Sequence, residues 1–328
     1  RPFIAMEYVK GVPITVYSDR HKLGLHQRLE LFNLVCEGVQ HAHQKAVIHR
    51  DLKPGNILVT EEDEQAVPKI IDFGVAKATG QQLTDLTMFT QIGQMIGTLE
   101  YMSPEQAELT GEGIDTRTDV YSLGVILYEL MTGTLPFDPF ALRRVGYDEM
   151  RRILREQNPR TPSTRLRVLD DQMRAILDAR NTDQNRWVRD LKGDLDWIIL
   201  KSLEKDRNRR YASPLEMAED VRRHLAHEPV LAARPGILYR SGKFVRRNRA
   251  AVAAAVLITV SAIVGVSGFV SGRLESIAAV QIARTQKPYA DAYALADLVQ
   301  RADKDLWPPY PEKIRDLELW IEDAEDLA

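Results

Sequence analysis

Cysteine is almost missing from this chain of 328 residues, since Cys36 is its single example. One cysteine cannot form an intramolecular disulfide, so the class of small secreted domains stapled by disulfides is excluded. The chain also lacks an excess of charge, because 44 basic and 47 acidic side chains leave a formal net charge of -3. This balance argues against a dedicated nucleic-acid-binding protein, and we expect no nucleic-acid partner.

The start of the chain lacks both an initiator methionine and the pattern of a secretory signal. Residues 3–6, close behind Arg1, already have the apolar pattern of a strand. We therefore expect a fragment that begins inside a domain. Hydrophobic residues make up 44% of the chain, which is ordinary for a globular protein and excludes wholesale disorder.

Charged residues are absent from one long segment, 250–270, which is apolar on every face. At 1.5 Å per residue this run spans roughly 30 Å, the thickness of a bilayer core. The sequence therefore predicts a single transmembrane helix, and a buried helix of a soluble domain is the alternative. Five basic residues precede the run and place the preceding part of the chain in the cytoplasm: Arg240, Lys243, Arg246, Arg247 and Arg249.

The apolar run divides the chain into four segments. Residues 1–230 have a mixed α/β pattern, and residues 231–249 are predicted to be a basic juxtamembrane linker at anionic lipid headgroups. Residues 250–270 are the transmembrane helix. Residues 271–328 carry seven basic and twelve acidic side chains and are predicted to be a truncated extracytoplasmic helical segment.

The strongest motif is the stretch from His49 to Asn56, which reads His-Arg-Asp-Leu-Lys-Pro-Gly-Asn. It follows an apolar helical pattern at about residues 29–43 and precedes the strand pattern 57–59. Asp72-Phe73-Gly74 comes sixteen residues after Asn56 and follows a second strand pattern. An isolated Asp-Phe-Gly is common by chance, but the ordered set is not. The set continues with Gly97-Thr98, Ser103-Pro104-Glu105 and residues 119–124.

With these motifs in this order, the chain resembles the protein kinase superfamily, specifically the bacterial Ser/Thr kinases of eukaryotic type with a transmembrane anchor. The resemblance covers roughly residues 1–228, and the activation stretch and Asp206–Ser213 are similar to kinases of planctomycete-type bacteria. It implies an α+β fold: a mainly helical protein-kinase C-terminal lobe, then one transmembrane helix and a short helical segment.

Phosphoryl transfer needs an oriented nucleophile and neutralised phosphate charge more than it needs covalent help. Asp51 can accept the proton of a substrate hydroxyl, and Lys53 can offset charge on the transferring group. Asn56 and Asp72 supply the hard oxygen ligands that Mg²⁺ requires, and Gly74 permits the turn that aims Asp72 inward. We therefore expect Mg²⁺ and ATP as cofactors.

The resemblance also assigns the adenine site and the activation segment. The residues expected to contact ATP are Met6, Glu7 and Val9 of the hinge and Leu58 beneath the adenine. The candidate phosphosites are Thr84, Thr87 and Thr90, and Thr98 is expected to hydrogen-bond the catalytic loop.

Four further residues are expected to be structural. Arg50 would pair with an activation-segment phosphate. Glu105 and Arg210 would form a buried ion pair, and Asp119 would hold the backbone of the catalytic loop.

The sequence lacks a Gly-rich phosphate loop, a strand lysine and a helix glutamate before the hinge, so we expect this fragment to be inactive by itself. The protein as a whole is predicted to be a membrane-anchored Ser/Thr kinase of the cell inner membrane, with a cytoplasmic kinase domain and protein substrates. A non-catalytic kinase-lobe scaffold at the membrane is the alternative. Small residues within Ser261–Gly272 would permit helix pairing, so a homodimer is a hypothesis.

Overall fold

The computed structural model describes residues 7–73, 99–108, 114–168, 173–233, 236–306 and 314–325. The chain forms two compact units, Arg1–Arg247 and Asn248–Ala328. Six of the residues named above lie outside the described residues: Met6, Gly74, Thr84, Thr87, Thr90 and Thr98. The predicted strand at residues 3–6 lies outside them as well.

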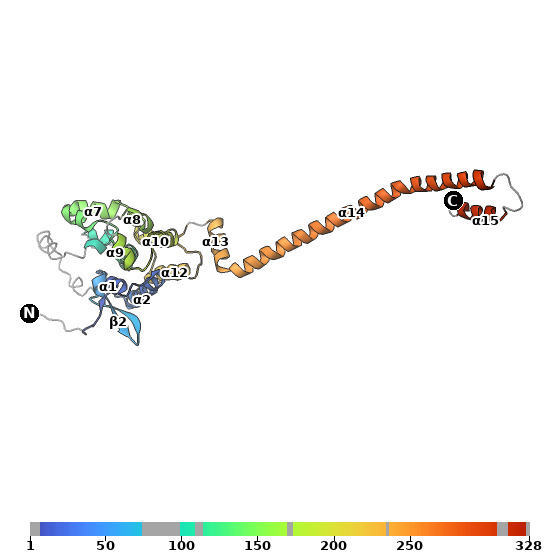
Figure 1. Cartoon of the computed structure of the whole chain (residues 1–328). Helices are drawn as coiled ribbons and strands as arrows, with labels where there is room; N and C mark the ends of the chain where they lie inside the picture. The colour runs from blue at the N-terminus through green and yellow to red at the C-terminus, as the bar shows by residue number, and fades with distance from the viewer. Residues whose placement is uncertain are drawn as a thin grey trace, which may run out of the picture. The chain divides into compact units, whose positions relative to one another are not determined.

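Helices dominate the first unit (Figure 1). Its longer helices are α2 (Leu25–Gln44), α5 (Arg117–Thr132), α7 (Tyr147–Glu156), α11 (Asp194–Ser202), α12 (Pro214–Leu225) and α13 (Ile237–Arg247). Its shorter ones are α1 (Ile14–Arg20), α4 (Pro104–Ala107), α6 (Pro139–Arg144), α8 (Pro162–Val168), α9 (Met173–Asp178) and α10 (Gln184–Leu191). The described residues of this unit also form the 3-10 turns η1 (Pro54–Asn56), η3 (Leu99–Tyr101) and η4 (Arg207–Arg209).

A small antiparallel sheet lies against α1 and α2. Its strands are β1 (Val12–Pro13), β2 (Ile57–Glu62) and β3 (Gln65–Ile70), in the order β1-β2-β3. The register pairs Ile57 with Ile70, so the two strand ends beside the catalytic-loop motif and the Asp-Phe-Gly motif meet. The sheet thereby brings two motifs that are far apart in the sequence to one edge.

The core forms around α5, on which nearly every side chain is buried. Other elements of the first unit, including α2, α8, α11 and α12, pack around this helix. Gly124 allows one of these close approaches, since a Cβ there would lie 2.0 Å from the Ser202 hydroxyl of α11. The apolar side of α2 packs against the same core through Phe32, Val35 and Val39.

The segment 231–249, which we expected to be a linker, contains helix α13, and this helix belongs to the first unit. Proline and glycine at positions 235 and 236 precede the helix rather than interrupt it.

The second unit consists mainly of α14 (Arg249–Arg301), which continues as a short π-helix, η5 (Ala302–Leu306), and α15 (Ile314–Glu325). In the described residues one helix is long and apolar enough to cross a membrane, by length and composition. The helix runs well past Val270, and Pro288 lies within it without ending it. Trp320 of α15 donates a hydrogen bond of 2.7 Å to the Leu298 carbonyl, so α15 packs back on α14.

Candidate active site

The loop from His49 to Asp51 is fixed by a carboxylate that lies far away in the sequence. Asp119, at the start of α5, is fully buried. Its Oδ2 accepts a 2.8 Å hydrogen bond from the His49 backbone N–H, and its Oδ1 accepts one of 2.8 Å from the Arg50 backbone N–H. The Nε2 atom of His43 lies 2.7 Å from the same Oδ2. These contacts set the backbone that presents Asp51.

The Asp51 carboxylate has two unequal oxygens. Its Oδ2 accepts hydrogen bonds from Lys53 Nζ at 2.9 Å and from Asn56 Nδ2 at 3.3 Å. The same Asn56 amide donates a 2.8 Å bond to the Asp51 carbonyl, which closes the loop on itself. The other carboxylate oxygen of Asp51, Oδ1, is buried and has no hydrogen-bond partner among the described residues. An ionised carboxylate that is held by one oxygen has the other available to accept a proton.

Asp72 follows strand β3 and lies beside this loop. The Ile71 backbone N–H donates a 3.0 Å hydrogen bond to the Asn56 carbonyl, which sets the next residue beside Asn56. The His49 ring contacts the two residues that flank Asp72 in the chain. Its Nε2 lies 2.9 Å from the Ile71 carbonyl oxygen, and its ring centroid lies 4.8 Å from that of Phe73. His49 therefore ties the Asp72 segment to the catalytic loop.

Two residues of the site have left-handed backbone conformations that are uncommon for residues other than glycine. Arg50 has a φ of 64° and Asp72 has a φ of 57°. Such conformations cost roughly 1–3 kcal/mol each and persist where the surroundings fix them. Asp119 fixes the backbone of Arg50, and the hydrogen bond between Ile71 and Asn56 fixes the chain next to Asp72. Asp72 itself therefore has a left-handed conformation, while the turn expected at Gly74 lies outside the described residues.

The site offers two protein oxygens that suit a magnesium ion. Asn56 uses its amide nitrogen within the loop, so its amide oxygen is the end that can coordinate a cation, and the Asp72 side chain is exposed. No group of three His, Cys, Asp or Glu side chains placed to hold a metal occurs in the described part of the chain. Mg²⁺ is commonly held by one or two protein ligands together with substrate phosphates, so the donor set fits Mg-ATP rather than a metal alone.

The expected adenine contacts lie near strand β2. Leu58 is half-buried on β2 opposite Pro13, Val9 is half-buried, and Glu7 is exposed. The chain turns at Gly11, whose N–H donates a 3.1 Å bond to the Val9 carbonyl. A Cβ on Gly11 would lie 2.9 Å from the Val59 carbonyl, so this close approach requires glycine.

Glu105 and Arg210 form the ion pair that joins α4 to the segment after η4. The Arg210 guanidinium makes two bonds to the carboxylate, of 2.6 and 2.8 Å, and its side chain is buried. Three backbone carbonyls accept the remaining N–H groups, at Glu204, Lys205 and Arg117. Burial alone would raise the pKa of Glu105, but Arg210 and a hydrogen bond from Thr118 outweigh it and lower the pKa.

Two supporting residues were missed by the sequence analysis. His43 lies 76 residues from Asp119, and Gln106 donates a 2.7 Å hydrogen bond to the Arg50 carbonyl. Gln106 also closes a capping box with Ser103 at the start of α4. The Ser-x-x-Gln spacing at 103–106 is the one sequence signal that could have predicted this helix start. Nothing local indicated the contact of His43 with Asp119.

Comparisons with known proteins identify the family of this chain. The family model of the protein kinase domain matches residues 1–224. Serine/threonine-protein kinase PknB of Mycobacterium leprae is 34% identical over 230 residues, which cover 70% of this chain and 31% of that protein. A probable serine/threonine-protein kinase of Streptomyces coelicolor is 35% identical over 231 residues, with 70% and 29% covered. A crystal structure of the Mycobacterium tuberculosis PknI kinase domain is 22% identical, with 67% and 65% covered and a TM-score of 0.43.

The chain belongs to the protein kinase family, and its curated relatives include bacterial serine/threonine-protein kinases. It spans about a third of the length of these relatives. The prediction of a bacterial kinase with a mainly helical lobe is confirmed. The resemblance to planctomycete kinases and the fragment expectation stay predictions.

Proposed function

We propose that the protein transfers the γ-phosphate of ATP to serine and threonine hydroxyls of protein substrates. The observation that carries the proposal is the Asp51 carboxylate, whose Oδ2 is held by Lys53 and Asn56 while its buried Oδ1 has no partner among the described residues. A carboxylate in this state can accept a hydrogen bond from a substrate hydroxyl and take its proton.

The other residues of the site have distinct roles in this proposal. Bound magnesium would neutralise charge on the ATP phosphates, and Asn56 and Asp72 are the residues that would hold it. Lys53 keeps the Asp51 carboxylate oriented and places a positive charge beside the transferring group. Arg50, with its Nε buried and unbonded in the described residues, is the candidate partner for an activation-segment phosphate.

Several finer assignments belong to the same proposal. Glu7, Val9 and Leu58, together with Met6, would contact the adenine. One or more of Thr84, Thr87 and Thr90 would be phosphorylated, and Thr98 would bind the catalytic loop. The preference for serine and threonine is supported by the names of the relatives.

We also propose that residues 250–270 of α14 span the inner membrane once, with the kinase lobe in the cytoplasm. The support is the long apolar helix and the basic residues that precede it. Basic side chains before the span would contact anionic lipid. Residues 271–328 would be extracytoplasmic, and pairing of the membrane helices would give a homodimer.

The test measures phosphate transfer by the protein expressed from its complete gene, because no Gly-rich loop or strand lysine precedes the hinge in these 328 residues. Incubation with Mg-ATP and analysis of the labelled amino acids should give phosphoserine or phosphothreonine. Asp72→Asn should abolish the label, and Asp148→Asn, at a position that is 97% exposed, should not. A protein that binds its partners but transfers no phosphate would instead support the scaffold alternative.

A further inference from the structure

Helix α13 carries four basic residues and no acidic one among its eleven residues, Ile237–Arg247. One side of this helix is fixed to the kinase lobe by Asp194, the first residue of α11, which is only 7% exposed. The Tyr239 hydroxyl donates a 2.8 Å hydrogen bond to Asp194 Oδ1, and the Lys243 ammonium bonds Oδ2. His224 of α12 lies 3.0 Å from the same Oδ2. The orientation of α13 on the lobe is therefore set.

Other contacts support the same docking. The Tyr239 ring packs edge-on against Trp197, with ring centroids 5.5 Å apart, and its hydroxyl accepts a 3.1 Å bond from the Val230 N–H. At the far end of the helix Arg247 bonds Glu228 at 2.9 Å. Both ends of α13 are thus tied to the lobe.

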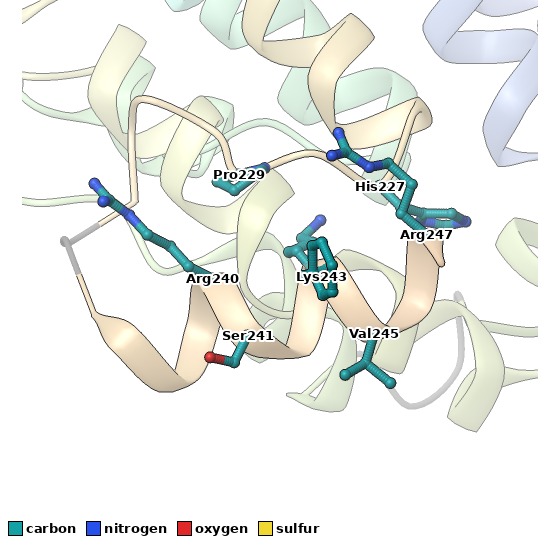
Figure 2. A pocket seen from close by; sticks show the side chains of 8 residues that line it. His227, Pro229, Arg240, Ser241, Lys243, Val245 and Arg247 are labelled. Atoms are coloured by element: carbon teal, nitrogen blue, oxygen red, sulfur yellow. The ribbon is translucent and has the colours of Figure 1, made fainter. Parts of the chain in front are cut away.

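Because Tyr239 and Lys243 face the lobe, the residues on the opposite side of α13 face outward. We call the outer face the set with spacing i, i+3, i+4, i+7 and i+8, which comprises Ile237, Arg240, Ser241, Phe244 and Val245. Its apolar members are 85%, 56% and 46% exposed at Ile237, Phe244 and Val245. Figure 2 shows that the side chains of Ser241 and Val245 point away from Pro229. The Lys243 side chain points toward the segment that contains Pro229.

Two hollows lie beside helix α13. One of about 390 Å³ lies between α13 and residues 227–229, lined by His227, Arg240, Phe244 and Arg247. The lobe-facing Tyr239 and Lys243 line a larger cavity of about 940 Å³, whose lining also includes the cations Arg186, Arg189, Lys192 and Arg246 and the acidic Asp190 and Asp194. An apolar strip with cations around it is the pattern of a helix that lies in a membrane interface.

We propose that the outer face of α13 docks on the anionic cytoplasmic leaflet, so that one helix is bound both to the lobe and to the lipid. This inference rests on the proposed membrane span. Two observations favour lipid as the occupant. Arg240 of the outer face has a charge complementary to an anionic leaflet, and α14, which holds the uncharged run 250–270, begins two residues after α13 ends. The proposed span therefore follows the outer face within a few residues along the sequence.

The experiment places a fluorescent label on the outer face of the full-length protein in nanodiscs. Ser241→Cys supplies the thiol. Burial raises the pKa of the Cys36 thiol, and that residue is fully buried, so the label reacts at the new site. Gln157→Cys is the matched position, exposed at the end of α7, which Figure 1 shows well away from α13 within the same unit. Nanodiscs contain either phosphatidylcholine alone or phosphatidylcholine with phosphatidylglycerol, each with spin-labelled lipid as the quencher.

The spin-labelled lipid should quench the label at 241 strongly in anionic nanodiscs and only weakly in neutral ones. The label at 157 should not be quenched in either kind of nanodisc. Arg240→Glu should lower the interfacial population at 241 by about 30-fold, since it changes the local charge by two units. Arg155→Glu, an equal charge change on α7, should leave the quenching unchanged.

Three results would overturn the proposal. Equal quenching in both lipids would remove the role of anionic charge, and no quenching in either would leave the outer face in water. A label shielded from a water-soluble quencher but not reached by lipid would show that a protein surface, such as a second copy, covers the face. Failure of the protein to enter nanodiscs would contradict the membrane span itself, whereas the quenching outcomes leave the span and the kinase activity intact.

Discussion

Two buried aspartates organise two regions of the lobe in different ways. Asp119 holds the catalytic loop through backbone N–H groups, and the loop it supports presents a carboxylate oxygen of Asp51 that has no partner among the described residues. Asp194 holds α13 through side chains, with Tyr239, Lys243 and His224 bonded to its two oxygens. The first region orders a backbone so that a reactive group stays available. The second region uses its carboxylate to fasten one element to another.

Among changes at the two organising aspartates, the larger loss of activity is expected for Asp119→Asn. An amide can accept only through one atom, so one of the His49 and Arg50 N–H groups would lose its acceptor and the loop that carries Asp51 would shift. Phosphate transfer should fall by about 100-fold, with the KM for ATP within about twofold, because misplacement of about 1 Å has this effect on rate. The free energy of unfolding should fall by about 1–3 kcal/mol. Steady-state kinetics and denaturant unfolding of the full-length protein measure both.

Asp194→Asn is the matched change at the other region and should give the opposite result. Loss of the charge leaves the largely buried Lys243 ammonium without its anion, which should lower the free energy of unfolding by about 3 kcal/mol. Amide exchange across 237–247 should accelerate. Transfer activity should stay within about twofold, since no bond joins Asp194 to the catalytic loop in the described residues. A loss of activity as large as that of Asp119→Asn would break the comparison.

Acid should weaken the attachment of α13 to the lobe. Burial alone would raise the pKa of Asp194, but hydrogen bonds from His224, Lys243 and Tyr239 lower it from 3.8 to about 2. A depressed folded-state pKa gives stability that is present above about pH 4 and is lost as the pH falls toward 2. After allowance for solvent screening, the loss is on the order of 1–2 kcal/mol. Exchange at 237–247 measured from pH 6 to pH 2 checks it, and Asp194→Asn should remove the dependence.

Tyr239→Phe should have the smallest effect. The substitution keeps the ring contact with Trp197 and removes the hydroxyl that links Asp194 to the Val230 N–H. We expect the free energy of unfolding to fall by about 1 kcal/mol, the usual contribution of a hydrogen bond. Thermal unfolding followed by tryptophan fluorescence measures it. A loss as large as that for Asp194→Asn would show that the hydroxyl, rather than the charge, holds the helix.

The catalytic-loop motif and the strands beside it were largely predictable because they are local in the sequence. Residues 49–56 form one continuous loop, and a strand pattern follows them. Because β2 and β3 are joined by a short turn, the two strands pair and Ile57 lies opposite Ile70. The helix predicted at about 29–43 extends from Leu25 to Gln44. Helix starts vary by a few residues, and here Gly24 rather than a polar cap precedes the helix.

The α13 region was not predictable from the sequence in the same way. Its proline, glycine and arginines suggested a linker, and the partners that make it a docked helix include Asp194 and Trp197. Asp194 lies 45 residues from Tyr239 and 49 from Lys243, and no motif links them. A helix of eleven residues is marginally stable in isolation, so tertiary contacts decide whether it forms.

The most direct test of the central claim combines two measurements on one variant, Asp51→Asn, in the protein expressed from its complete gene. The account assigns Asp51 to the proton of the substrate hydroxyl and Asn56 and Asp72 to magnesium. Binding of Mg²⁺ with a non-hydrolysable ATP analogue should therefore stay within about twofold, while phosphate transfer falls by about 10²- to 10⁴-fold. Transfer that survives the substitution, or binding that is lost together with transfer, would contradict the account.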